Sequence, residues 1–325
     1  MLKDNHGREH SYLRISLTEK CNLRCTYCMP EDGVDLRPSR EYMTVKEVLN
    51  LARQFVELGV NKIRLTGGEP LVFKGFSEVL IGLAELPVEL SITTNGIQLH
   101  KYFDELQRAN VSKINISIDT LEEEKFNVLT RRKGFSKVWQ SIREAIKRGF
   151  HVKLNMVVMK GFNDNEVVDF VALTNDLPIE VRFIEFMPFD GNQWNWDKVV
   201  PEAQLMNVIE QHFGQSSLQT LPLEKNYIAR TFSLPDAKGC FGFISTMTHS
   251  FCGGCNRIRL TADGHIKNCL FTDDEIDLLT PLREGKSVVH LIEQSIKNKH
   301  PRNGGIDFEN PASIHAHRSM ISIGG

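Results

Sequence analysis

The sequence lacks long apolar runs and has no excess of charge of one sign. Its 39 lysines and arginines stand against 41 acidic residues, for a formal net charge of -2, so no overall field attracts the chain to nucleic acid or to an anionic membrane. No segment approaches the length of a membrane span, and residues 1–16 carry charges throughout, without the apolar stretch of a signal peptide. We therefore predict a cytoplasmic protein that binds neither nucleic acid nor membranes.

Disulfides are a poor explanation for the seven cysteines. An odd number cannot pair completely within one chain, and a reducing compartment disfavours a disulfide framework. The chain also has no need of such cross-links, because 325 residues of which 41% are apolar can build a substantial core. Metal ligation is the leading interpretation of the cysteines.

Strand and helix patterns alternate along the first part of the chain. A capping box of Thr44 and Glu47 predicts a helix over 45–58, a second helix is predicted over 137–148, and Asp119 and Asn163 are predicted to cap further helices. Strands are predicted over 12–17, 61–66, 89–94, 112–118, 151–158 and 180–187. Such alternation indicates parallel βαβ units. We predict an α/β barrel or partial barrel over residues 1–190, followed by a smaller unit over 191–325.

Polar and apolar residues alternate along these strands, which is unusual for parallel strands that are covered on both faces. Ile63 and Leu65 share one face of a strand, whereas Lys62 and Arg64 share the other. The basic residues placed in this way are Arg14, Lys62, Arg64, Lys153 and Arg182. Singly, such residues are commonly solvated or salt-bridged. Together they favour a polyanionic ligand, such as a polyphosphate, inside the barrel.

Three cysteines, Cys21, Cys25 and Cys28, lie in the loop after the first predicted strand. Three thiolates at this spacing can bind three irons of a four-iron cluster and leave the fourth iron open for a substrate. A structural zinc ion is the alternative, and it would need a fourth protein ligand. The second strand is followed by Gly67-Gly68-Glu69-Pro70, which predicts either a tight turn or a close approach of the backbone to a ligand.

A second group of cysteines lies in the last third of the chain and consists of Cys252, Cys255 and Cys269. A zinc ion would again require a fourth ligand, for which His249, His265 and Cys240 are candidates. Cys240 is otherwise predicted to be a buried strand residue without a chemical role. An open iron at this second site would serve as a substrate site.

The cysteine spacing of residues 21–28, together with residues 67–70, resembles the radical S-adenosylmethionine (SAM) superfamily. Three further stretches, 181–188, 251–271 and Gly324-Gly325, resemble the GTP 3',8-cyclase family of molybdenum cofactor biosynthesis. The similarity extends from about Tyr12 to Gly325. It departs after Pro70, where the family commonly has leucine and then arginines, whereas this chain continues with Leu71, Val72, Phe73 and Lys74.

The resemblance implies a partial (β/α)6-type radical SAM barrel with a C-terminal extension that carries a second iron-sulfur cluster. Two [4Fe-4S] clusters are implied, one on each group of three cysteines. SAM would chelate the open iron of the first cluster and contact Tyr27, Gly68, Ser117 and Met187. GTP would bind the open iron of the second cluster through its guanine. Its implied contacts are Arg14, Arg64, Thr93, Lys153, Arg257 and Arg259, with Lys62 and Arg182 as further candidates.

The activity implied by the resemblance is that of a lyase, which converts GTP to 3',8-cyclo-7,8-dihydro-GTP. Hydrogen is removed from the ribose 3' carbon, and that carbon then attacks C8 of the purine. No catalytic side chain beyond the clusters and SAM is implied, since holding the two carbons near contact supplies much of the acceleration. The Gly324-Gly325 pair is expected to reach the active site.

The resemblance also implies partners. A reductant protein of unknown identity would supply electrons, and cyclic pyranopterin monophosphate synthase would receive the product. A homodimer is one option for the assembly.

Two other classes of protein remain open. A radical SAM enzyme that acts on a peptide would share the first cysteine motif, but it needs no cavity for a polyanion. A zinc-binding interaction module would explain the cysteines, but neither residues 67–70 nor the inward basic residues. Iron content separates the zinc module from the two enzymes, since two four-iron clusters bring about eight irons.

Overall fold

The computed structural model describes residues 1–29, 33–222, 228–310 and 318–324. Within them, twelve strands form one sheet in the order β12-β11-β10-β1-β2-β3-β4-β5-β6-β9-β8-β7. Its central part consists of six parallel strands, β1 (Tyr12–Ser16), β2 (Lys62–Thr66), β3 (Glu89–Thr94), β4 (Lys113–Ser117), β5 (His151–Val158) and β6 (Ile179–Glu185). The predicted succession of parallel βαβ units is confirmed.

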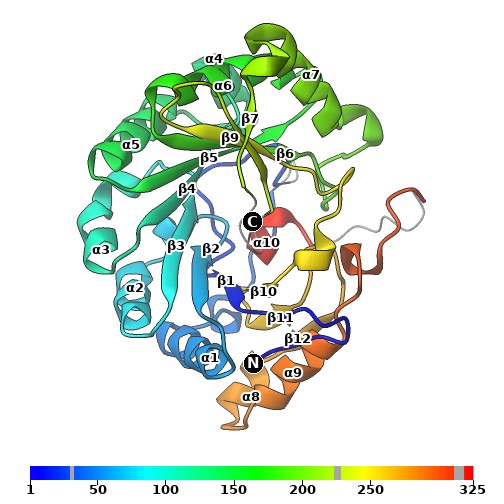
Figure 1. Ribbon diagram of the computed structural model, residues 1–325. Coiled ribbons are helices and arrows are strands. Elements are labelled where there is room, and N and C mark those ends of the chain that lie inside the picture. Colours follow the sequence, from blue (N-terminus) through cyan, green and yellow to red (C-terminus); the bar gives the residue numbers. More distant parts are fainter. Residues whose placement is uncertain (30–32, 223–227, 311–317, 325) are drawn as a thin grey trace.

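Helices cover the outer face of this curved sheet, and its inner face surrounds the centre of the molecule (Figure 1). They are α1 (Val45–Glu57), α2 (Phe76–Ala84), α3 (Phe103–Arg108), α4 (Glu123–Thr130), α5 (Phe135–Lys147) and α6 (Val167–Asp176). The capping box of Thr44 and Glu47 is present at the start of α1. Ile63 and Leu65 belong to the buried core together with Phe55 of α1. Burial of each such side chain contributes about 1.5–3 kcal/mol to the free energy of folding. Because the apolar face of each strand packs against the helices, the basic face points into the barrel.

Asn163 stands at the N-cap position of the 3-10 helix η4 (Asp164–Glu166), but its side chain forms no capping hydrogen bond, and Asp119 precedes no helix directly, so the predicted capping was wrong. The carboxylate of Asp119 accepts hydrogen bonds from the Tyr27 hydroxyl and from the backbone N–H of Val157, both at 2.8 Å. The Asn163 amide donates to the carbonyl oxygens of Asp119 and Val157. Short polar side chains bond loop backbone as readily as helix ends, and here they tie together the loops that follow β4 and β5.

The later part of the chain extends the same sheet at both edges. Next to β6 lies β9 (Cys240–Ile244), and next to β1 lies β10 (Arg257–Leu260), both paired in parallel. The remaining elements are α7 (Glu202–Phe213), β7 (Gln219–Thr220), β8 (Arg230–Ser233), β11 (His265–Lys267), β12 (Glu275–Asp277), α8 (Leu279–Arg283), α9 (Val289–Lys297) and α10 (Met320–Ile323). A domain boundary at residue 190 stays a prediction.

The short helix α10 lies in the middle of the ring of strands (Figure 1). Ile323 anchors it there, in a small second core with Phe189, Phe271 and Phe308. In the described residues, no helix is both long and apolar enough to cross a membrane.

Candidate functional site

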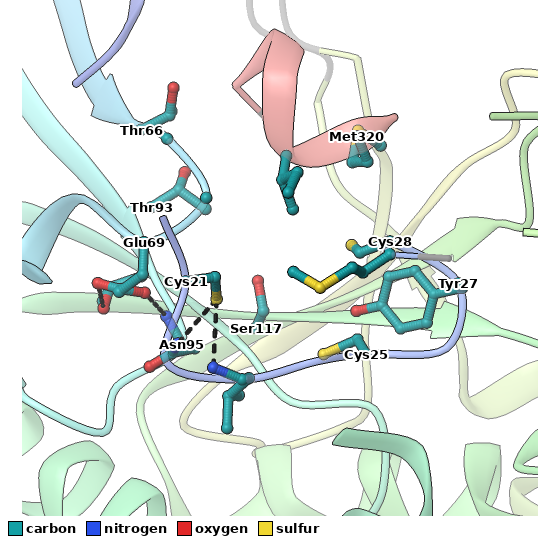
Figure 2. Close-up of a pocket in the computed structure, with 16 residues that line it drawn as sticks. Cys21, Cys25, Tyr27, Cys28, Thr66, Glu69, Thr93, Asn95, Ser117 and Met320 are labelled. Atoms are coloured by element: carbon teal, nitrogen blue, oxygen red, sulfur yellow. Dashed lines mark hydrogen bonds between the residues drawn. The ribbon is translucent and has the colours of Figure 1, made fainter. Parts of the chain in front are cut away.

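A cavity of about 110 Å³ lies at the carboxyl ends of β1 to β4, with room for more than one water molecule. The three cysteines of the loop after β1 all border it, as do Tyr27, Gly68 and Ser117 (Figure 2). These predicted residues come from three separate strand ends. On the other side the cavity is lined by Met320 and Ile321 of α10.

The cysteine loop is held against residues 67–70 by contacts that leave no room for a side chain. The Gly68 N–H donates to the carbonyl oxygen of Thr18 at 2.6 Å, and the Glu69 N–H donates to that of Lys20 at 2.9 Å. A Cβ atom on Gly68 would lie 2.6 Å from the carbonyl oxygens of both Glu19 and Lys20. Glycine is therefore required because the backbone approaches the cysteine loop itself.

The thiols of this first group are desolvated and lie near acidic residues. Burial raises the pKa of Cys21 to about 11. Burial, with further contributions from Cys28 and Asp119, raises the pKa of Cys25 well above its ordinary value. None of the seven cysteines forms a disulfide. Because ligating thiolates must lose these protons, the donor set fits a metal group that supplies positive charge of its own.

Glu69 is a site residue for which the sequence indicated no separate role. Its buried carboxylate accepts hydrogen bonds from the Thr94 hydroxyl at 2.7 Å, from the Asn95 N–H at 2.7 Å and from the Leu71 N–H at 3.1 Å. Burial raises its pKa to about 7 in spite of these hydrogen bonds. On the wall of the cavity, this carboxylate can pair with an ammonium group of a ligand.

The second group of cysteines lines another cavity, of about 70 Å³, together with Arg257 and Arg259. Burial acts to raise the pKa of Cys255, but Lys299 and Arg257 outweigh it and lower that pKa. Burial raises the pKa of Cys269. This site also offers three thiols in one cavity, and it differs from the first in having cationic neighbours.

A zinc ion at the second site would lack the fourth ligand it needs. Cys240 lies on β9, across the sheet from β10. His265 pairs with Asp263 at 3.3 Å. Of the three candidates for a fourth ligand, Cys240, His265 and His249, none lines the cavity. Across the described parts of the chain, no group of three or more His, Cys, Asp or Glu residues is arranged to hold a single metal ion. In a cluster each iron takes its own thiolate, so the two donor sets fit clusters better than zinc.

The basic residues converge on the inner face of the barrel, as predicted. Arg259, Arg14 and Arg64 stand side by side on the neighbouring strands β10, β1 and β2. On the opposite wall, Glu180 pairs with Lys153 at 2.5 Å and with Arg182 at 2.6 Å.

The basic side chains that converge inside the barrel repel one another. Burial and the charge of Arg182 lower the pKa of Lys153 to about 8, and burial and Arg257 lower the pKa of Arg259 to about 10. Protonated basic groups in such a place are stabilised by an anion.

Tyr12 is a second residue that the sequence did not indicate. The charged groups of Lys62, Arg64 and Arg257 lie 5.3, 5.6 and 5.9 Å from the centre of its ring. Burial acts to raise the pKa of Tyr12, but the surrounding cations, Arg64 foremost, lower it to about 8. An aromatic residue at the start of a strand is a common core residue, so the pattern gave no signal for this arrangement.

Gly324 brings α10 into contact with the basic wall. Its carbonyl oxygen accepts a hydrogen bond from Nη1 of Arg259 at 2.7 Å. Its backbone has φ +72°, and a Cβ atom would lie 2.7 Å from Oγ1 of Thr66 and 2.9 Å from Cβ of Ser16. The structure thus places Gly324 at the site, whereas Gly325 lies outside the described residues.

Residues 15–174 match the Radical SAM superfamily, and residues 179–304 match Molybdenum Cofactor Synthesis C. The chain is 42% identical to the GTP 3',8-cyclase of Syntrophomonas wolfei, with 99% of each chain covered. The chain belongs to the GTP 3',8-cyclase family. As a radical SAM family member it uses SAM and an iron-sulfur cluster.

The family also includes longer chains. Molybdenum cofactor biosynthesis protein 1 of Homo sapiens is 47% identical over 94% of this chain, but the match covers 49% of that protein. This chain thus spans about half the length of such relatives. Among solved structures, SuiB of Streptococcus suis bound to S-adenosylmethionine has a TM-score of 0.61 at 15% identity, covering 88% of this chain and 66% of that one. This likeness confirms the radical SAM barrel fold.

Other predicted residues have the following positions, and the ligand contacts implied for them stay predictions. Thr93, expected at GTP, lines the first cavity. Met187, expected at SAM, packs against the second core and lines neither cavity. Lys62 pairs with Glu89 at 3.1 Å. Lys74, in the stretch that departs from the family, is exposed.

Polar atoms without a partner support a polar ligand between the two cavities. Oγ1 of Thr93 and Nε of Arg257 are buried and form no hydrogen bond within the described structure. Such atoms are costly to bury unless a ligand or water satisfies them.

Proposed function

We propose that the protein is a GTP 3',8-cyclase with one [4Fe-4S] cluster in each cavity, and that it forms 3',8-cyclo-7,8-dihydro-GTP for molybdenum cofactor biosynthesis. The observation that carries this proposal is the basic barrel interior between two cavities of three cysteines each. A nucleoside triphosphate matches it, because its phosphates can meet the basic wall while its base reaches the second cavity.

The first cavity would hold the radical-generating pair. Cys21, Cys25 and Cys28 would bind the cluster, which together with SAM supplies the one-electron chemistry that removes hydrogen from the substrate. Glu69 would accept a hydrogen bond from the amino group of SAM. The apolar side chains of α10 would keep water away from the reacting atoms.

The basic wall would bind and orient the triphosphate of GTP. Arg14, Arg64 and Arg259 stand in one row and can donate to several phosphate oxygens at once. Glu180 holds Lys153 and Arg182 in place on the facing wall. Fixing the substrate at both ends sets the distance between the ribose and the purine, which favours ring closure over loss of the radical.

Arg64→Ala should weaken GTP binding by roughly ten- to a hundredfold, the usual loss for a hydrogen bond to a charged group. Arg64 is buried, and its Nε donates to the Ser91 hydroxyl at 3.1 Å, so the substitution removes a fixed phosphate donor. Calorimetry with the reconstituted protein measures the affinity, and circular dichroism verifies the fold. Arg53→Ala, on the exposed side of α1, is the matched control. Unchanged affinity in Arg64→Ala would count against the proposed triphosphate site.

The proposed reaction is tested by product formation. With both clusters reconstituted, and with SAM and a reductant present, 5'-deoxyadenosine should form faster with GTP than with ATP or without nucleotide. Equal formation in all three mixtures would remove the GTP assignment. Iron analysis should give about eight irons per chain.

The same proposal includes the setting of the reaction. Electrons would come from a reductant protein, and the product would pass to cyclic pyranopterin monophosphate synthase. The protein would act in the cytoplasm, with a homodimer as one option.

A further inference from the structure

Lys299 reaches the second group of cysteines from just beyond the end of α9. Its side chain is buried, with 4% of the residue exposed. Nζ lies 3.6 Å from Sγ of Cys255 and donates to the carbonyl oxygen of Arg257 at 2.9 Å. Among the described residues, no carboxylate forms a salt bridge with Lys299. A buried ammonium requires a counter-charge, and the thiolate of Cys255, 3.6 Å away, can provide one.

Arg8 holds the chain segment that carries Lys299. It donates to three carbonyl oxygens, those of Cys252 at 2.8 Å, His300 at 2.7 Å and Pro301 at 2.9 Å. Its Nε pairs with Asp4 at 2.6 Å. One guanidinium therefore links a cysteine of the second group to the residues that follow Lys299, and a lysine could not reproduce this fork of donors. Figure 1 shows the start of the chain beside α9.

Within the described ranges, no lysine or arginine donates a hydrogen bond to a sulfur atom of the first group of cysteines. The sulfur of Cys21 accepts hydrogen bonds from the backbone N–H of Leu23 at 3.4 Å and from the Asn95 amide at 3.8 Å, both neutral donors. Carboxylates act on this first group, Glu69 on Cys21 and Asp119 on Cys25, together with the neighbouring thiols. The two sites thus differ in the sign of the charge beside their sulfur atoms.

We propose that the ammonium group of Lys299 raises the reduction potential of the second cluster. The inference rests on the proposed function, since it requires that cluster. One-electron reduction adds a negative charge to the cluster, and the ammonium beside Cys255 stabilises the reduced state more than the oxidised one. Hydrogen bonds to the sulfur atoms and burial are known determinants of cluster potential.

Substitution of Lys299 by methionine removes the charge and keeps a long side chain. The full chain, reconstituted without oxygen, is titrated with dithionite while each cluster is followed by electron paramagnetic resonance. In Lys299→Met, the ratio of reduced to oxidised second cluster at a fixed potential should fall about tenfold, which corresponds to about 59 mV for one electron. The first cluster should titrate as in the wild type. The titration is repeated in a Cys25→Ala background, which removes a ligand of the first cluster, so that the shifted signal can be assigned to the second cluster.

The control variants separate charge from packing. Lys299→Arg should restore most of the wild-type potential, and Lys297→Met, at an exposed position of α9, should change neither cluster. If Lys299→Met fails to retain iron, Lys299→Gln keeps a hydrogen-bond donor without the charge and should show the same fall. A wild-type potential in a neutral variant with about eight irons would overturn the role of Lys299 and leave the proposed function intact. About four irons in the wild type would overturn the second cluster, and the inference with it.

Discussion

Deletion of Gly324 and Gly325 should lower GTP turnover about a hundredfold while both clusters keep their iron. The Gly324 carbonyl is a partner of Arg259, at 2.7 Å, and Arg259 shares a row with Arg14 and Arg64. Without this contact, the guanidinium can move and the substrate with it, and a displacement of about 1 Å can cost a hundredfold in rate. A steady-state assay of the truncated protein measures its GTP turnover, and iron analysis measures whether the clusters are retained.

A single substitution tests whether the place of Gly324 matters. Gly324→Ala brings a Cβ atom to 2.7 Å from Thr66 Oγ1, at a backbone φ of +72°. The matched control is Gly285→Ala, because Gly285 has φ +73° and nothing within 4 Å of a built Cβ. Both variants incur the same left-handed backbone penalty of roughly 1 kcal/mol, but only Gly324→Ala should lose turnover.

Three outcomes would contradict this role of Gly324. Full activity after truncation would show that Arg259 needs no partner from α10. Equal losses in Gly324→Ala and Gly285→Ala would assign the effect to backbone strain alone. Loss of iron from the truncated protein would point to a structural role for α10 instead.

Much of the site could be predicted because its signals are local. The spacing within residues 21–28 places three thiols in one loop. The alternation of Ile63, Arg64 and Leu65 determines which face of β2 packs under the outer helices and which faces the barrel interior. Both features depend on neighbours only a few residues away. Parallel pairing then aligns such faces from one strand to the next, so the basic interior followed from single-strand patterns.

The remaining features depend on contacts between distant parts of the chain. Arg8 bonds the carbonyl of Cys252 across 244 positions of sequence, and neither residue has a pattern that indicates the other. Asp119 has the residue type of a helix cap, yet it bonds Tyr27, 92 positions away. Thr93 lies near the end of β3 and Met187 follows β6. Only the packing of α10 and the second core decides which cavity each can reach.

SAM should bind about tenfold more weakly at pH 6 than at pH 8. Burial raises the pKa of Glu69 from 4.5 to about 7, so its carboxyl is mostly protonated at pH 6 and mostly ionised at pH 8. The amino group of SAM donates a hydrogen bond to the ionised form only, and each pH unit below the pKa then weakens binding by about tenfold. Equilibrium binding of SAM to the reconstituted protein at the two pH values measures the effect.

Variants and a truncated ligand assign this pH dependence to Glu69. Glu69→Gln should bind SAM weakly at both pH values, whereas Glu85→Gln, at an exposed position, should bind like the wild type. Methylthioadenosine, which lacks the amino acid part of SAM, should bind with little pH dependence. Equal wild-type affinity for SAM at pH 6 and pH 8 would contradict the pairing.

Protein stability provides an independent measure of the same titration. A folded-state pKa above the unfolded value stabilises the protein fully below about pH 4.5, and this contribution is lost as the pH rises through about 7. The ligand-free protein should therefore lose thermal stability over this interval, and Glu69→Gln should lose less. SAM should restore more stability at pH 8 than at pH 6, because its amino group donates a hydrogen bond to the ionised carboxylate and so stabilises it in the cavity.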